Sequence, residues 1–361
     1  MRIDPAPRRS AALLTAGALI ASLAACSSGG SSGTAVDAVA YPEGTPLAAA
    51  AAATCEPSDK KPEDLSVAFL PPASSFNYYL AIGKGVEARA QGVGAEYFML
   101  APVEDNVSQQ LGMIQDAATR GADVIIMNTH DQNAAAPVVK QATDQGIAVI
   151  LVNSDIPDFP TPVHAVVGYK QREGDHKVGE YAVEHAAGAE IKYGIIDGAP
   201  GWFTDERTGG FQDGVADADN FEFVARVNGE WSIDGGNAAA MDLLQANPDI
   251  NLLFAANDYM AQGAAQAAKT LGRDVVIYGS DGDTNSGLEE VAAGNIQATL
   301  DTAPYEMGQI AMQVALDCLS GDFPGGLFVE SPGNVVDASN VNALLCVPER
   351  LAPPPNKEYE C

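Results

Sequence analysis

The stretch SVAFLPPASSFNYYLAIGKG, residues 66–85, decides the fold class. Its first five residues, apolar except for Ser66, predict a strand that is buried on both faces, as in a parallel sheet. In nucleotide-binding α/β proteins, the turn after the first strand carries a glycine-rich phosphate loop. Here the turn carries three aromatic residues and an amide instead, namely Phe76, Asn77, Tyr78 and Tyr79. Aromatic faces and an amide suit an uncharged ring rather than a phosphate.

The same strand signal recurs along the chain and alternates with helical patterns. Ten strands are expected, at residues 66–70, 96–100, 123–128, 148–153, 164–169, 193–197, 221–227, 251–257, 274–280 and 296–301. Helical spacing of apolar residues is seen between them, and a glycine follows the helices at 106–120, 134–145 and 259–271. Asp105 and Asp258 are the expected N-caps of the first and third of these helices. The alternation predicts an α/β protein with two doubly wound, Rossmann-like parallel sheets.

The composition limits the class of protein. The 361 residues are enough for two domains, and 47% of them are hydrophobic. The 48 acidic residues outnumber the 19 basic residues and give a formal net charge of −29. Because such a surface repels nucleic acid and anionic lipid headgroups, neither is an expected partner.

The N-terminus has the three parts of a signal peptide. Arginines lie in residues 1–10, an apolar run covers residues 11–25, and the motif LAAC ends at Cys26. The apolar run is shorter than the about 20 residues that a membrane span needs. LAAC resembles the lipobox of bacterial lipoproteins, in which the cysteine is acylated. We therefore expect a signal peptide at residues 1–25 and a lipid-anchored flexible tether at 26–56, on the outer face of the cell membrane.

Four cysteines follow the lipobox, namely Cys55, Cys318, Cys346 and Cys361. Export places them in an oxidising compartment, where disulfides are stable. Four cysteines allow three pairings, and the sequence does not choose among them. We favour Cys318 with Cys346, and Cys55 with Cys361 so that the two ends of the chain are joined.

Polar and aromatic side chains follow the expected strands. In open α/β sheets, ligands bind beyond the carboxyl ends of the strands. The side chains found there are amides, carboxylates, one arginine and aromatics, at Phe76, Asn77, Tyr78, Tyr79, Asn128, Asp131, Asn153, Ser154, Asp155, Arg207, Trp231, Asn257, Asp281 and Thr302, among others. Carboxylates accept hydrogen bonds from hydroxyls, amides both donate and accept, and aromatic faces cover C–H groups. This set predicts a neutral, polyhydroxylated ligand.

Four segments in order resemble the sugar-binding type 1 periplasmic binding proteins. The segments are RGADVIIMNTHD at 120–131, ERTGGFQDGV at 206–215, LFAANDYMAQGAAQAA at 253–268 and VVIYGSDG at 275–282. The resemblance covers about residues 65–342. It implies two lobes that are joined by a hinge of three chain crossings, near Tyr169, Thr302 and Ser331. The expected N-terminal lobe is 57–168 plus 303–331, the C-terminal lobe is 169–302 plus 332–350, and 351–361 is a tail.

The resemblance also implies which residues bind the ligand. In the family, an aromatic pair at the positions of Tyr78 and Tyr79 packs on the sugar; we expect Tyr78 in the cleft and Tyr79 in packing or as a second wall. Trp231 matches a stacking aromatic, and Thr302 matches a hinge residue. Polar contacts are implied for Asn128, Arg207, Asn257 and Asp281; Asp131 is a candidate only through its place after the third strand.

Some positions depart from the family pattern. Phe76 stands where the family often has an amide, and Asn77 offers one a position later. Asn153 and Ser154 stand where the family has a carboxylate and an arginine, and Asp155 offers a carboxylate a position later. These departures argue against ribose itself and leave pentoses, hexoses, polyols, cyclitols and nucleosides open.

Two further side chains are candidates for the cleft. Trp202 is a second candidate lid aromatic, and His130, beside Asp131, is the one histidine that we expect near the cleft. The histidines show no metal-ligand spacing, and no metal or cofactor is expected.

The leading hypothesis is a monomeric, lipid-anchored solute-binding protein. By closing its hinge, it would capture a sugar or polyol and deliver it to an ABC permease. A ligand-sensing module for a membrane signalling receptor is the alternative that the sequence leaves open. An enzyme is not expected, because the sequence has no GxGxxG, P-loop, nucleophile elbow or metal cluster, and no catalytic residue is assigned.

Overall fold

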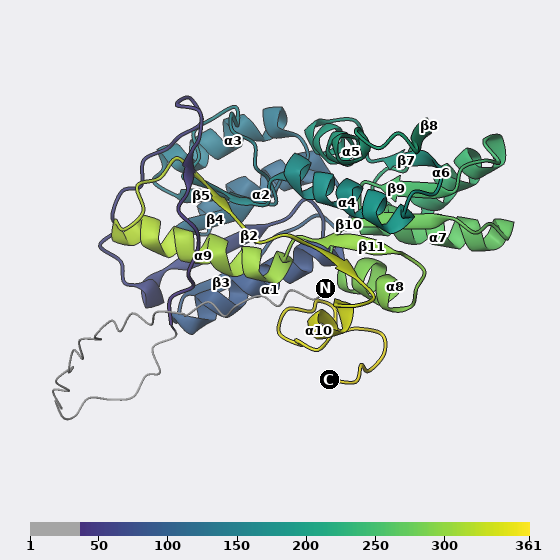
Figure 1. The fold of residues 1–361 in the computed structure, drawn as a ribbon. Coiled ribbons are helices and arrows are strands. Elements are labelled where there is room, and N and C mark those ends of the chain that lie inside the picture. Colours follow the sequence, from purple (N-terminus) through teal and green to yellow (C-terminus); the bar gives the residue numbers. More distant parts are fainter. Residues whose placement is uncertain (1–36) are drawn as a thin grey trace, which may run out of the picture. The chain divides into compact units, whose positions relative to one another are not determined.

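Two sheets, drawn in Figure 1, form the framework of residues 37–361, the part of the chain that this computed structural model describes. The first sheet has the order β1 (Thr45–Pro46), β12 (Leu327–Glu330), β6 (Ala165–Gly168), β5 (Ala148–Val152), β4 (Val124–Met127), β2 (Ser66–Leu70) and β3 (Glu96–Met99). The second has the order β13 (Asn334–Asp337), β11 (Ala298–Asp301), β10 (Val276–Asp281), β9 (Leu252–Ala255), β7 (Ile191–Asp197) and β8 (Phe221–Asn228). β1 and β13 pair antiparallel, and the other pairs are parallel. The predicted fold class is confirmed.

Helices accompany each sheet and define two lobes. The first lobe holds η1 (Pro62–Asp64), α1 (Asn77–Gly92), α2 (Val107–Thr119), α3 (Gln132–Asp144) and α9 (Pro304–Ser320). The second lobe holds α4 (Gln171–Ala186), α5 (Trp202–Val215), α6 (Ile233–Ala246), α7 (Asp258–Leu271), the π-helical turn η2 (Thr284–Leu288), α8 (Glu289–Ala292) and α10 (Val341–Leu345). Each lobe therefore has the helix–sheet–helix layering that parallel sheets require.

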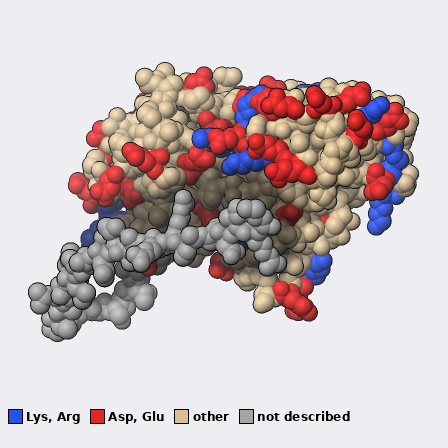
Figure 2. Space-filling view, viewed as in Figure 1, with Lys and Arg blue, Asp and Glu red and all other residues tan. Residues whose placement is uncertain are grey.

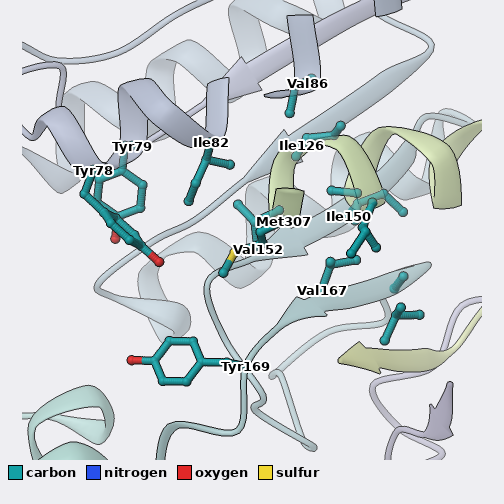
Figure 3. Packing of buried hydrophobic residues seen from close by; sticks show 14 of the residues in the cluster. Tyr78, Tyr79, Ile82, Val86, Ile126, Ile150, Val152, Val167, Tyr169 and Met307 are labelled. Atoms are coloured by element: carbon teal, nitrogen blue, oxygen red, sulfur yellow. The ribbon is translucent and has the colours of Figure 1, made fainter. Parts of the chain in front are cut away.

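The strands are buried because their residues are apolar on both faces. Every residue of β4 and β5 is buried, and Ile126 and Ile150 are fully buried. On one face of the first sheet, Ile82 of α1 and Met307 of α9 pack over these two isoleucines, as Figure 3 shows. The other face is covered by α2 and α3. Apolar burial of this kind contributes about 25 cal/mol per Å² and is the main force that holds the lobe together.

Two glycines let α1 and α9 approach each other closely. A Cβ placed on Gly85 would collide with the carbonyl oxygen of Tyr305, and a Cβ on Gly308 would collide with that of Ile82. The close contact fixes the direction of α1, whose first turn carries Tyr78 and Tyr79.

The chain passes between the lobes three times. It leaves the first sheet after β6, returns after β11 to form α9 and β12, and leaves again to form β13. Tyr169, Thr302 and Ser331 lie at these crossings and are all at most 2% exposed. All three crossings lie next to one another in the structure. Ser331 N donates to Gly168 O, and a Cβ placed on Gly333 would lie 3.8 Å from both Asp301 O and Tyr169 Cβ.

Residues 37–56 differ from the expected flexible tether. β1 pairs with the edge strand β12, Leu47 is 7% exposed, and Ala51 is completely buried. Tyr41 Oη donates to Asp317 Oδ2 at 2.6 Å on α9. The prediction was wrong for this part of the segment because it covers a sheet edge that would otherwise expose unpaired backbone groups. The rest of the expected tether, the signal peptide and Cys26 lie outside the described residues.

The disulfides also differ from the favoured pairing. Cys55 bonds to Cys318 with a Cα–Cα distance of 5.1 Å, and Cys346 bonds to Cys361 with a distance of 5.6 Å. The prediction was wrong because Cys318 lies on α9 in the first lobe, whereas Cys346 follows α10 in the second lobe. The segment that covers the sheet edge brings Cys55 to α9.

Both expected N-caps lie one residue away from the observed ones. Asn106 caps α2 by accepting from Gln109 N, and Asn257 caps α7 by accepting from Met260 N. Asp105 instead contacts His130, with Oδ2 at 2.6 Å from Nδ1. Asp258 is completely buried, where Oδ2 accepts from Gly282 N and Asp283 N.

The surface of the described chain is acidic. Figure 2 shows Asp and Glu side chains gathered along the upper face of both lobes, with fewer Lys and Arg among them. Within residues 37–361, no helix is both long and apolar enough to cross a membrane.

We predict that the two disulfides differ in their contribution to stability. Cys55–Cys318 closes a loop of 263 residues and Cys346–Cys361 one of 15 residues. In the chain-entropy model, the longer loop stabilises the folded state by roughly 2 kcal/mol more. Urea unfolding of the Cys55→Ser/Cys318→Ser and Cys346→Ser/Cys361→Ser variants measures both losses in the free energy of unfolding. Equal losses would contradict the prediction.

Candidate ligand-binding site

A cavity lies between the lobes, at the carboxyl ends of the strands. It holds about 400 Å³ of empty space, counting its opening to solvent. The first lobe lines it with Phe76, Tyr78, Tyr79, His130 and Asn153, and the second lobe with Phe203, Arg207, Trp231, Asn257, Tyr259 and Asp281. A ligand held there would touch both lobes at once.

Several of these side chains are directed into the cavity by a strained backbone conformation. Asn153, Trp231 and Asp281 have φ values of 55°, 59° and 133° and so lie in the region that favours glycine. Each follows or ends a strand, where the chain turns out of the sheet. Strained backbone of this kind costs about 1–3 kcal/mol per residue and is concentrated at functional sites.

A buried ion pair forms the deep wall of the cavity. Arg207 Nη1 donates to Asp281 Oδ1 at 2.8 Å and to Ala256 O at 2.9 Å. Arg207 Nε donates to Gln171 Oε1 at 2.8 Å, and the guanidinium lies 5.7 Å from the ring centre of Trp231. Arg207 and Asp281 are 3% and 5% exposed. The two charges therefore neutralise each other away from water.

Burial and the ion pair act in opposite directions on both charged groups. Burial raises the pKa of Asp281 to about 6, and the nearby Arg207 keeps it from rising further. Burial disfavours the charged form of Arg207, but Asp281, together with Tyr169, Asp175 and Tyr78, more than offsets this and raises the pKa of Arg207 well above its usual value. At pH 7 the deep wall therefore holds one positive and one negative charge.

The two tyrosines at the start of α1 both line the cavity. Tyr78 Oη donates to Asn153 Oδ1 at 2.9 Å and lies 2.8 Å from Thr302 Oγ1. Tyr79 Oη donates to Asn128 Oδ1 at 2.9 Å and lies 3.2 Å from His130 Nε2. Figure 3 shows the two rings side by side at the start of α1, at the edge of the apolar core. Tyr78 is thus in the cleft, and Tyr79 forms a second wall.

Eight of the fourteen expected ligand residues line the cavity, namely Phe76, Tyr78, Tyr79, Asn153, Arg207, Trp231, Asn257 and Asp281. Asn257 does so although it also caps α7, which corrects the expectation that only Asp258 caps.

The other six expected residues do not line this cavity. Asn128 and Thr302 lie behind it, where they hold the hydroxyls of the two tyrosines. The remaining four have local roles: Asn77 N donates to Tyr259 Oη, Asp131 caps α3, Ser154 Oγ accepts from Ile156 N, and Asp155 Oδ2 accepts from Gln171 N. The carboxylate of Asp155, two positions after Asn153, therefore lies at the hinge and not in the cavity.

Two lining residues were missed by the sequence analysis. Phe203 begins α5 after β7, and Tyr259 begins α7 after β9. The rule that ligands bind at strand ends would have included both. His130, the histidine expected near the cleft, does line the cavity, whereas Trp202 lines a neighbouring hollow together with Asp131. In residues 37–361 there is no group of three His, Cys, Asp or Glu that could hold a metal ion.

Comparisons with known proteins agree with this architecture. The sequence model of the family described as "Periplasmic binding protein domain" matches residues 67–322. The D-ribose/D-allose-binding protein of Pseudomonas aeruginosa is 32% identical over 295 residues, which are 77% of this chain and 90% of that protein. The ribose import binding protein of Bacillus subtilis is 26% identical over 68% of this chain and 78% of its own length.

Solved structures agree as well. An ABC transporter solute-binding protein of Mycobacterium smegmatis with bound glycerol is 29% identical, with a TM-score of 0.70 over 78% of this chain and 96% of that one. A solute-binding protein of Actinobacillus succinogenes with bound D-allose, at 24% identity and a TM-score of 0.70, covers 78% of this chain and 100% of its own and supports the fold. The two-lobed fold, the cavity between the lobes and these similarities together show that the chain belongs to the type 1 periplasmic binding protein family.

Proposed function

We propose that this protein is an extracytoplasmic solute-binding protein that captures a sugar or polyol and delivers it to an ABC importer. The observation that carries the proposal is the enclosed cavity with a charge-neutral polar wall. Asn153, Arg207, Asn257 and Asp281 lie together there beside Trp231. Two relatives support this: the Pseudomonas aeruginosa protein is named for binding D-ribose and D-allose, and the Bacillus subtilis protein is named for binding ribose for import.

The electrostatics of the deep wall favour an uncharged ligand. Because Arg207 and Asp281 neutralise each other, a charged ligand would enter a buried site with no counter-charge to spare. Hydroxyls, in contrast, can donate to the carboxylate and accept from the guanidinium, so that the ion pair and the ligand share hydrogen bonds. The indole of Trp231 offers an apolar face to the C–H groups of the same ligand.

Hinge closure is the proposed mechanism of capture. The lining residues come from both lobes, so a ligand gains its full set of contacts only when the lobes are together. The three crossings between the sheets are the segments at which the lobes can rotate. The closed protein would then dock on the membrane permease.

We expect a monosaccharide or polyol to stabilise the protein, and Asp281→Ala to abolish this. The substitution removes a hydroxyl acceptor and leaves Arg207 buried without its partner, so binding should weaken at least about 100-fold. A thermal-shift screen of pentoses, hexoses and polyols, followed by calorimetry, measures the effect. Small-angle scattering of the same samples should show a smaller radius of gyration with ligand.

Asp213→Asn is the matched control for this experiment. Asp213 pairs with Arg172 on the surface of the same lobe, where both side chains are about half exposed, so its loss should leave binding unchanged. Trp231→Ala, which keeps the ion pair, provides a second variant should Asp281→Ala fail to fold. Folded wild-type protein that binds no member of the panel would contradict the proposed function.

Binding should weaken in acid through Asp281. Its pKa of about 6 is raised by burial, and a ligand hydroxyl that donates to the carboxylate stabilises the charged form. Binding therefore lowers this pKa, and the affinity is complete above pH 6 and falls by up to about tenfold per pH unit below it. Calorimetry between pH 5 and 7.5 measures the change.

The variant Asp281→Asn isolates this carboxylate from other groups that titrate nearby. Burial raises the pKa of Asp155, at the hinge, to about 7, so it changes charge over the same range. The variant should bind weakly and with little dependence on pH. An acid dependence equal to that of the wild type would assign the effect to another group.

We further propose that Cys26 carries the lipid that anchors the protein to the cell membrane. The support is the sequence alone: arginines, an apolar run and the LAAC motif. In cells, labelled palmitate should be incorporated into the wild type and not into Cys26→Ala, which should appear in the medium. Equal incorporation in both would exclude this anchor.

A further inference from the structure

Aromatic rings from both lobes form a continuous group at one side of the cavity, called here the mouth cluster: Phe76, Tyr79, His130, Phe203 and Tyr259. The ring centres of Phe76 and Tyr259 are 5.7 Å apart, and those of His130 and Phe203 are 6.0 Å apart. Phe76 and His130 belong to the first lobe and the other two to the second. The cluster therefore meets across the opening between the lobes.

The polar atoms of the mouth cluster are already paired within the protein. Tyr259 Oη accepts from Asn77 N at 2.6 Å and donates to Asp283 Oδ2 at 3.1 Å. Tyr79 Oη donates to Asn128 Oδ1, as described above, and lies 3.4 Å from Asn153 Nδ2.

The imidazole of the cluster contacts protein groups at both nitrogens. His130 Nδ1 lies 2.6 Å from Asp105 Oδ2, and Nε2 lies 3.2 Å from Tyr79 Oη. Because the one proton of Tyr79 Oη goes to Asn128 Oδ1, both contacts are hydrogen bonds when the imidazole donates from both nitrogens. Phe76 and Phe203 have no polar side-chain atoms. This side of the cavity therefore presents apolar ring surface and offers a ligand hydroxyl no free partner.

The deep wall has hydrogen-bonding capacity to spare. Within the described residues, Arg207 uses Nε and Nη1, and Asp281 uses Oδ1, which leaves Nη2 and Oδ2 for a ligand. Asn257 Nδ2 donates one of its two protons to Trp231 O, and the other is available to a ligand. The cavity is thus polarised: hydroxyl partners lie at the deep wall, and paired rings lie at the mouth.

The accessibility of the side chains gives the direction of this polarity. The four polar residues of the deep wall are 3–5% exposed. In the mouth cluster, Tyr79 and Tyr259 are 5% and 9% exposed, whereas Phe76, His130 and Phe203 are half-buried, so the cluster extends from the buried end of the cavity to its opening. A bound ligand therefore turns its hydroxyl-rich end inward and its other end toward the rings.

We infer that the ligand is a sugar that lacks the hydroxyl on its terminal carbon, such as a 6-deoxyhexose; this inference rests on the proposed function. A methyl group at the mouth packs against ring surface and loses no hydrogen bond. A hydroxyl at the same place gives up its bonds to water and finds Tyr79, His130 and Tyr259 already paired. Apolar surface discriminates against an added hydroxyl by at most about 100-fold, which sets the scale of the preference.

Matched pairs of sugars that differ only at the terminal carbon test the inference. The pairs are D-fucose with D-galactose, L-fucose with L-galactose, and L-rhamnose with L-mannose, each titrated into the wild-type protein by calorimetry. In every pair that binds, the deoxy sugar should bind about 10- to 100-fold more tightly. A parent hexose that binds as tightly as its deoxy partner overturns the inference and leaves the proposed function standing.

Phe203→Asn and Phe203→Leu assign the preference to the mouth cluster. Phe203 lies in the first turn of α5 and is half-buried, so both substitutions preserve the core. The asparagine gives a hydroxyl a partner and should reduce the preference to a few-fold, whereas the leucine should keep it. An unchanged preference in Phe203→Asn refutes the assignment. If none of these six sugars binds but a pentose or polyol does, the inference is overturned and the proposed function stands; if no pentose, hexose or polyol binds, both are contradicted.

Discussion

The buried ion pair between Arg207 and Asp281 is the constraint on which the site depends. Taking two charges out of water is expensive, and their 2.8 Å contact offsets this only with further hydrogen bonds. Gln171 and the carbonyl of Ala256 provide them, so α4, α5 and the end of β9 are all held by one guanidinium. The site is thereby shaped before any ligand arrives, which reduces the entropy that binding has to overcome.

A network of hydrogen bonds behind the cavity connects the binding site to the hinge. Tyr78 connects Asn153 of the first lobe with Thr302 at a crossing, and Thr302 Oγ1 in turn donates to the backbone carbonyl of Asp281. Residues outside the cavity, such as Thr302, therefore fix the position of residues that line it, such as Tyr78. Lining residues and supporting residues both follow strand ends, so the position after a strand does not distinguish them in the sequence.

The sequence was most informative about properties that depend on one secondary-structure element, such as whether a strand is buried. The run VIIM of β4 is apolar at every position, so a strand buried on both faces follows without knowledge of its neighbours. Contacts between elements that are distant in the sequence could not be predicted from it. The partner of Cys318 depends on the path of residues 37–56 along the sheet edge, and the place of Phe203 in the cavity depends on the approach of the second lobe. Helix starts were misplaced by one residue because Asp105–Asn106 and Asn257–Asp258 each offer two good caps.

The bond between Cys55 and Cys318 has a mechanical consequence. It joins the segment that enters the fold to the C-terminal end of α9, within the first lobe and away from the three crossings. A pull on the chain from its N-terminal side is therefore carried covalently into the first lobe and does not load the hinge. In the proposed hinge closure, a protein held from its N-terminal side would keep its first lobe stationary, and the second lobe would move.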